Sequence, residues 1–411
     1  MRPLRLAVFS VTASSLMVSA ALGAALTGPA DAAPPSKGGS DSTTTTTTTK
    51  GKGGKPTATT TATPTPTAAP QVCHTLADAA ALTTVRGRTV NTLFPHDGRV
   101  FYGYGDYTAN TGSMIDPYGT NVSSFDAATG VAAVHLPGFK TEEVNTFRSF
   151  DGDIYAPNID PSRGADGSNS FASDAGQTWT ENAGAPNPVH VFDVAKAGGE
   201  LFVAGAEPIA SPAGTTHGAA TIWRSTDAGA TWTVAQSETE EDVTKRDGFE
   251  RYYWMGVIGD KVYARAALNT YPAVPPLRVL DTTTDTWSTV PESGMTFGTS
   301  IYEASRVVSW QNRLWTAQGA LVWFDGAKTG AIGVAGGGAN LRTLSIGDDG
   351  KLYGHDWVNG AVYRVDSTST AYALTRVATI APDAASFTVA GGNVWAAAAA
   401  GTAQVCSTPL A

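Results

Sequence analysis

A short pattern recurs seven times along residues 71–411 and constrains the fold more than any other feature. It consists of a small or polar turn residue, a polar residue, an aliphatic residue and an aromatic residue, and it ends at Phe101, Tyr155, Phe202, Tyr263, Trp315, Tyr353 and Trp395. The first and last aromatics are 294 residues apart over six intervals, a mean period of 49 residues. A period near 50 residues that carries several short strands is typical of propeller blades. We therefore predict an all-β, seven-bladed β-propeller, with the pattern at the turn from each innermost strand to the second.

The seventh repeat ends too early to contain a full blade. Its missing outer strand must come from elsewhere, and the segment 71–85 precedes the first blade. The only two cysteines, Cys73 and Cys406, lie at the two ends of the repeat array. In a secreted chain this placement suggests a single disulfide bond that closes the whole domain. We expect the N-terminal strand to complete the last blade and the disulfide to secure it.

Two segments precede the propeller. Residues 1–32 have the form of a secretory signal peptide, with Arg2 and Arg5 before an apolar stretch and a small-residue cleavage site at 30–32. An uncleaved membrane anchor is the alternative for this segment. Residues 33–70 consist mostly of Thr, Pro, Gly, Ser, Ala and Lys, which cannot bury a core, so we predict a disordered linker. The expected location is secreted or associated with the cell surface, with no membrane span after signal cleavage.

The charge of the propeller region limits its partners. Residues 71–411 contain 34 acidic and 21 basic residues. Because nucleic-acid binding needs clustered positive charge, we expect no nucleic-acid partner. The six histidines show no zinc-ligand spacing, and no phosphate-binding loop or calcium loop is present, so we predict neither a metal nor a cofactor. We expect a monomer.

Two segments share a turn motif between strand-like runs. Residues 225–232 read Ser-Thr-Asp-Ala-Gly-Ala-Thr-Trp, and 173–179 read Ser-Asp-Ala-Gly-Gln-Thr-Trp. In such a turn the Asp accepts backbone N–H groups and Gly takes a positive φ. The segments resemble the Asp-box, or BNR repeat, of sialidase-like β-propellers, S-x-D-x-G-x-T-W. This resemblance implies a structural role for Asp174 and Asp227 at the turn from the third to the fourth strand of a blade.

The resemblance does not extend to the catalytic motif of sialidases. Those enzymes carry an F/Y-R-I-P motif, and the nearest fragment here is Phe147-Arg148-Ser149-Phe150, which lacks Ile-Pro. We therefore take the propeller fold from the resemblance and do not expect sialidase activity.

Loop length points to one face of the propeller. In this fold the second-to-third and fourth-to-first loops lie on the face opposite the Asp-box turns. The second-to-third loops of blades one to four are long, and long ordered loops on a rigid scaffold tend to carry function. The first of them contains four residues that we predict to bind ligand: Tyr104, Asp106, Tyr107 and Asn110. A loop packed only on itself is the alternative reading.

The starts of two innermost strands add further candidates. Arg251 and Tyr252 open the innermost strand of blade four, and we predict that they contact ligand at the channel. Glu250, Tyr302 and Glu303 occupy similar positions and are the candidates for catalysis.

We therefore expect a secreted binding module for a glycan or another extracellular polymer. The alternative is a glycoside hydrolase or lyase of the sialidase-like propeller type that acts through channel carboxylates. Two carboxyl groups about 5 Å or about 6.5–9.5 Å apart would favour the enzyme. A purely structural surface protein is the third possibility.

Overall fold

The structure is a computed structural model that describes residues 71–108, 120–139, 141–159, 171–174, 178–181, 184–186, 188, 190–210, 216–239, 250–267, 274–292, 296–298, 307–334, 339–368 and 371–411. The predicted signal peptide (1–32) and linker (33–70) lie outside these residues, so both remain predictions. No helix in the described ranges is long and apolar enough to cross a membrane.

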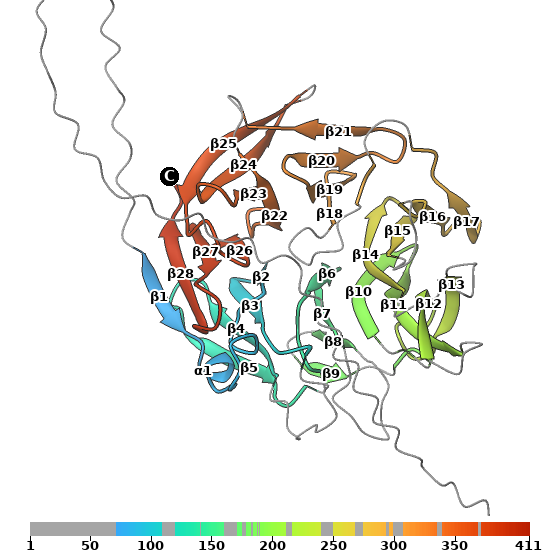
Figure 1. The fold of residues 1–411 in the computed structure, drawn as a ribbon, viewed down its shortest axis with the longest axis horizontal. Helices are drawn as coiled ribbons and strands as arrows, with labels where there is room; N and C mark the ends of the chain where they lie inside the picture. Colours follow the sequence, from blue (N-terminus) through green and yellow to red (C-terminus); the bar gives the residue numbers. More distant parts are fainter. Residues whose placement is uncertain are drawn as a thin grey trace, which may run out of the picture. The chain divides into compact units, whose positions relative to one another are not determined.

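The described residues form seven antiparallel sheets of four strands each, arranged around a central channel (Figure 1). From the innermost strand outward, blades one and two consist of β2 (Thr92–His96), β3 (Arg99–Gly103), β4 (Val122–Asp126) and β5 (Ala132–Leu136), then β6 (Arg148–Phe150), β7 (Asp153–Pro157), β8 (Phe171–Asp174) and β9 (Trp179–Glu181). Blades three and four consist of β10 (His190–Ala197), β11 (Glu200–Ala210), β12 (Thr216–Ser225) and β13 (Thr233–Glu238), then β14 (Arg251–Ile258), β15 (Lys261–Ala267), β16 (Arg278–Asp281) and β17 (Thr286–Thr289).

The remaining blades follow the same order. Blades five and six consist of β18 (Val308–Trp310), β19 (Arg313–Ala317), β20 (Leu321–Phe324) and β21 (Thr329–Ile332), then β22 (Leu341–Ile346), β23 (Leu352–Asp356), β24 (Ala361–Ser367) and β25 (Tyr372–Thr379). Blade seven consists of β26 (Phe387–Ala390), β27 (Asn393–Ala397), β28 (Gln404–Pro409) and β1 (Val72–Thr75). The prediction of a seven-bladed, all-β propeller is confirmed.

The N-terminal strand closes the last blade. Strand β1 pairs antiparallel with β28 in a register that places Cys73 opposite Cys406, and the two form a disulfide. The predicted closure is therefore confirmed. The sequence did not predict α1 (Ala77–Ala80), a short helix after β1 whose Ala79 is fully buried in the core between blades seven and one.

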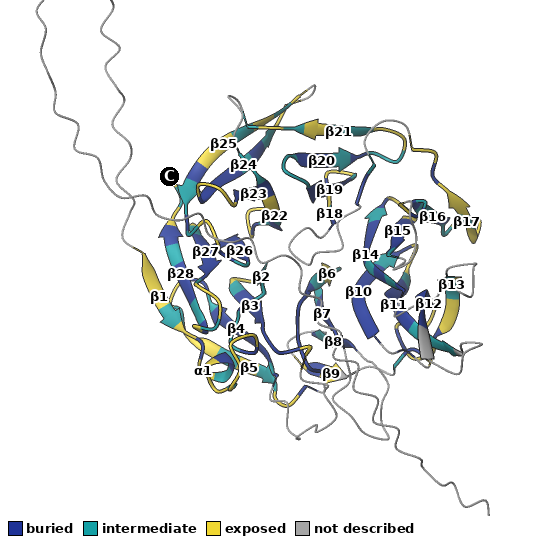
Figure 2. Ribbon diagram, in the orientation of Figure 1, coloured by how far each residue is buried: buried dark blue, intermediate teal, exposed yellow. Residues whose placement is uncertain are grey.

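The recurring aromatic residues form the core between blades. Each of them lies in the second strand of its blade, where the adjacent blades cover both faces of the sheet. All seven are buried: Phe101, Tyr155, Phe202, Tyr263, Trp315, Tyr353 and Trp395. Figure 2 shows that the second strands, such as β3, β7 and β23, are largely buried, whereas exposed residues follow the outer strands β1, β13 and β17. Aromatic side chains bury large apolar areas. One such residue at the same position of each blade therefore accounts for the regular spacing of the sequence pattern.

The turn between β12 and β13, which resembles an Asp-box in sequence, is held by its own side chains. The carboxylate of Asp227 accepts hydrogen bonds from the backbone N–H and the hydroxyl of Thr231, at 2.8 Å and 2.6 Å. The hydroxyl of Ser225 donates to Asp227 and accepts the N–H of Gly229 at 2.8 Å. Ala228 and Gly229 take positive φ angles of 57° and 90°. These bonds lower the pKa of Asp227 to about 2, the Thr231 hydroxyl contributing most. Because the turn joins the third strand of its blade to the fourth, it lies on the face opposite the second-to-third loops.

Candidate functional site

The innermost strands enclose a channel of about 720 Å³, a volume suited to a small ligand. Its wall contains both apolar and polar side chains, and the polar ones include Asn91, Asn145, Thr343 and Ser386. Among the described residues that line it, the carboxylates are Asp97 and Asp348, and both lie in first-to-second strand turns, on the same side as the third-to-fourth turns. The predicted catalytic candidate Glu250 does not line this channel.

A buried ion pair joins the inner strands of three blades at the channel wall. The guanidinium of Arg148 in β6 donates two hydrogen bonds of 2.7 Å to the carboxylate of Asp193 in β10. Asp193 is fully buried and also accepts the backbone N–H of Met255 in β14 at 2.8 Å. Burial acts to lower the pKa of Arg148, but the charge and hydrogen bonds of Asp193 outweigh it and raise that pKa. The guanidinium of Arg148 is therefore paired with Asp193, unlike a sialidase arginine that binds the carboxylate of its ligand.

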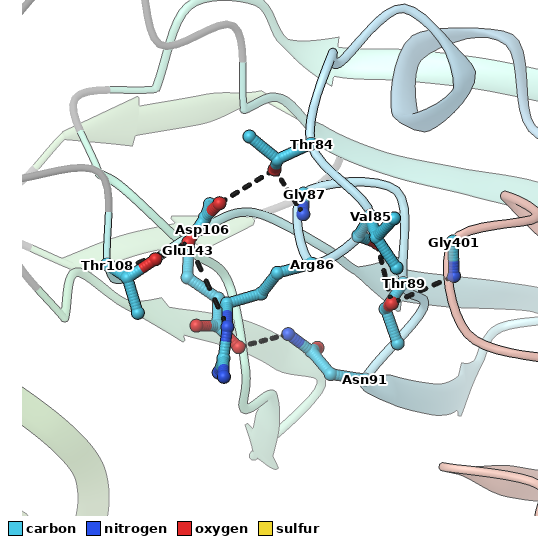
Figure 3. Close-up of polar contacts among 10 residues, drawn as sticks. All are labelled: Thr84, Val85, Arg86, Gly87, Thr89, Asn91, Asp106, Thr108, Glu143 and Gly401. Atoms are coloured by element: carbon cyan, nitrogen blue, oxygen red, sulfur yellow. Dashed lines mark hydrogen bonds and ion pairs between the residues drawn. The ribbon is translucent and has the colours of Figure 1, made fainter. Parts of the chain in front are cut away.

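Asp106 lies in the loop after β3 and is oriented by two threonines (Figure 3). One carboxylate oxygen accepts the hydroxyl of Thr84 at 2.7 Å, and the other accepts the N–H and hydroxyl of Thr108 at 3.0 Å and 2.6 Å. Partial burial acts to raise the pKa of Asp106, but these hydrogen bonds together lower it. The side chain is an ionised, fixed group at the rim of blade one.

Tyr107 follows Asp106 and is exposed, with 42% of its surface accessible. The guanidinium carbon of Arg86 lies 4.2 Å from the centre of its ring. Arg86 also approaches Asp106, with 4.0 Å between its Nε and the carboxylate. The segment 84–89 and the β3–β4 loop thus present a tyrosine ring and a guanidinium side by side.

Tyr104, which we predicted to bind ligand, is instead fully buried in the core between blades seven and one. Its hydroxyl donates to Asp78 of α1 at 3.2 Å and accepts the N–H of Asn121 at 2.8 Å. Burial and the adjacent Asp78 charge raise its pKa. Asn110 lies outside the described residues.

The start of β14 holds three of the predicted residues. Tyr252 is fully buried, and burial raises its pKa well above the usual value, so its ring is not accessible to a ligand. Glu250 is also buried, and its backbone N–H donates to the carbonyl of Gly218 at 3.1 Å. Arg251 is partly exposed and donates to the hydroxyl of Tyr253 at 2.9 Å. Tyr302 and Glu303 lie outside the described residues.

The sequence-based prediction of the site missed Trp357. This residue lies in the β23–β24 loop of blade six with 39% of its surface accessible, and the guanidinium carbon of Arg342 lies 4.6 Å from its ring centre. Asp356 holds the loop, because one carboxylate oxygen accepts the N–H groups of Asn340 at 3.0 Å and Val358 at 2.9 Å. The loop is short, so loop length gave no reason to select it.

Comparisons with known proteins identify structural neighbours but no family. No family model matches the chain, and no curated protein matches its sequence. Virginiamycin B lyase from Staphylococcus aureus is 10% identical with a TM-score of 0.48, and the match covers 83% of this chain and 99% of that one. A streptogramin B lyase is 12% identical (TM-score 0.47; 83% and 98% covered), and YCF48 from Cyanidioschyzon merolae is 12% identical (0.42; 79% and 96%). Likenesses this distant say nothing about activity, and the propeller assignment here rests on the strand topology.

Proposed function

We propose that this protein is a secreted binding module that holds a glycan or another extracellular polymer on the face formed by its second-to-third loops. One observation carries the proposal. Among the described residues, Tyr107 and Trp357 are the only large aromatic side chains that are exposed. Each lies in the loop that follows the second strand of its blade.

Topology places the two rings on one face. Strands β3 and β23 are each second in their sheet, and the blades of a propeller run in the same sense around the channel. Val274 in the β15–β16 loop and Val358 beside Trp357 are exposed on this face as well. Exposed rings surrounded by polar groups are typical of recognition surfaces.

The chemistry of these side chains suits a sugar. A pyranose has apolar C–H faces and hydroxyl edges, so it can stack on an aromatic ring and donate hydrogen bonds to a fixed acceptor. Tyr107 and Trp357 offer the rings, and Asp106 offers an oriented carboxylate next to one of them. A scaffold that positions such groups in advance lowers the entropy cost of binding.

The test is a glycan array on the purified protein, with titration of any glycan that binds. Tyr107→Ala and Trp357→Ala are each expected to weaken binding by about 1 kcal/mol or more, the scale of anchoring aromatic residues. Val131→Ala is the control, because Val131 is also exposed but lies in the β4–β5 turn on the opposite face. If both aromatic variants bind the glycan as tightly as the wild type does, the proposal that this face binds the glycan is refuted.

Product analysis separates binding from catalysis. Glycan that is bound and recovered intact supports the module, whereas cleavage supports the hydrolase or lyase.

A further inference from the structure

The arginines of the described residues divide into two groups. Most donate at least one hydrogen bond from the guanidinium, as Arg148 and Arg251 do. Arg86 and Arg342 donate none to any residue that the structure describes, and both are exposed. The carboxylate of Asp106 lies 4.0 Å from the Nε of Arg86, which is an ion-pair contact beyond hydrogen-bonding distance. These two arginines are also the ones that lie over Tyr107 and Trp357. An exposed arginine that makes no hydrogen bond within the described part of the chain thus lies beside an accessible ring twice, on the same face.

From this pairing we infer that the face recognises an acidic heteroglycan, in which uronic acid units are spaced by neutral sugars. The inference rests on the proposed function and names the class of its ligand. Each Arg–aromatic pair offers a ring for the apolar face of a pyranose and a planar fork of N–H donors for its carboxylate. Guanidinium and carboxylate match in a bidentate geometry, which lysine cannot provide.

The two pairs lie on either side of blade seven. Strand β26 contacts β2 of blade one and β22 of blade six, so blade seven separates the Tyr107 and Trp357 loops. Its own second-to-third loop, 398–403, consists of Ala, Gly and Thr, and carries no charge. The segment 84–89, which carries Arg86, is anchored to this loop, because the Thr89 hydroxyl accepts the Gly401 N–H at 3.0 Å (Figure 3). In addition, Arg88 donates to the carbonyl of Gly401 at 2.9 Å. An extended polymer can therefore cross small side chains between the two cations.

The overall charge of the domain argues for spaced carboxylates. With 34 acidic and 21 basic residues in 71–411, a polymer charged at every unit would be repelled by most of the surface. A chain with a neutral sugar between acidic ones places its charges at the two guanidinium groups and fewer elsewhere. Two weak sites on one chain also reinforce each other.

The experiment compares probes that differ only in charge. Binding of the purified protein is measured by calorimetry with a hyaluronan octasaccharide, which alternates glucuronate and N-acetylglucosamine, and with the same octasaccharide after carboxyl reduction. The acidic probe should bind about tenfold or more tightly. Arg86→Gln and Arg342→Gln should each weaken its binding by about five- to tenfold, the scale of one partly exposed charge-assisted hydrogen bond, and leave the reduced probe unchanged. Arg376→Gln is the control, since Arg376 is exposed in the outer strand β25.

Each contrary outcome has a distinct meaning. Equal affinity for the acidic and reduced probes, lost in Tyr107→Ala, overturns the inference and leaves the proposed function intact. No binding of any glycan overturns both. Tighter binding of polygalacturonate, charged at every sugar, or of an oligothymidylate refutes the spaced-carboxylate ligand, and the oligothymidylate result also refutes the glycan class.

Discussion

Replacement of Cys73 and Cys406 by serine should destabilise the propeller through the unfolded state. The disulfide joins residues 333 positions apart. In the chain-entropy model, closing a loop of that length lowers the entropy of the unfolded chain and so destabilises the unfolded state by roughly 5–6 kcal/mol. This is an upper figure, because an unfolded chain that retains structure loses less entropy. For roughly 340 residues unfolding cooperatively, it corresponds to a fall in Tm of about 7–8 °C.

The assay is equilibrium urea denaturation of the oxidised wild type and the double serine variant, followed by fluorescence of the core tryptophans. Strand β1 is mostly exposed and is held by its pairing with β28, so the native fold should persist without the disulfide. Ser407→Ala is the matched control, because it alters β28 beside the disulfide without opening the loop. A double variant within about 1 kcal/mol of the wild type would refute the argument that closure acts by restricting the unfolded chain.

Three further substitutions test the packing that supports the face. Ser225→Ala removes the acceptor of the buried Gly229 N–H and should lower the free energy of unfolding by about 1–3 kcal/mol, while glycan affinity stays constant. Asp193→Asn leaves the Arg148 cation buried without its carboxylate and should cost about 3–5 kcal/mol in urea denaturation; a loss below about 1 kcal/mol would contradict the assigned pair. Burial lowers the pKa of His355 to about 4, so below its unfolded value of 6.5 the unfolded state binds a proton that the folded state does not. The free energy of unfolding should therefore decrease as the pH is lowered from 6.5 to 4. In denaturation curves recorded over this pH range, His355→Leu should remove the part of the decrease that is due to His355.

The architecture could be predicted because it is repeated. One aromatic per blade and a turn motif recur at a constant period, and the two cysteines mark the ends of the array. The helix α1 could not, since a four-residue helix shows no periodicity in sequence.

The site was only partly predictable, because exposure depends on distant contacts. Tyr104 and Tyr107 lie in the same loop sequence, yet Tyr104 is buried by Asp78 and Asn121, to which no local pattern connects it. Trp357 lies in a short loop, and its exposure depends on how the surrounding side chains pack, which the sequence alone does not show. Sequence reasoning ranks loops by length and composition, whereas burial decides which rings a ligand can reach.

Hydroxyl-radical footprinting, read by mass spectrometry with and without a glycan taken from the array, tests the central claim most directly, because it reports which face the ligand covers. Bound glycan should protect Tyr107 and Trp357 from oxidation, and should leave Val131 and the exposed Val234 of outer strand β13 as reactive as in the free protein. Protection confined to the side of the third-to-fourth turns, or unchanged oxidation of both aromatic residues at saturating glycan, would contradict the assignment of the binding face.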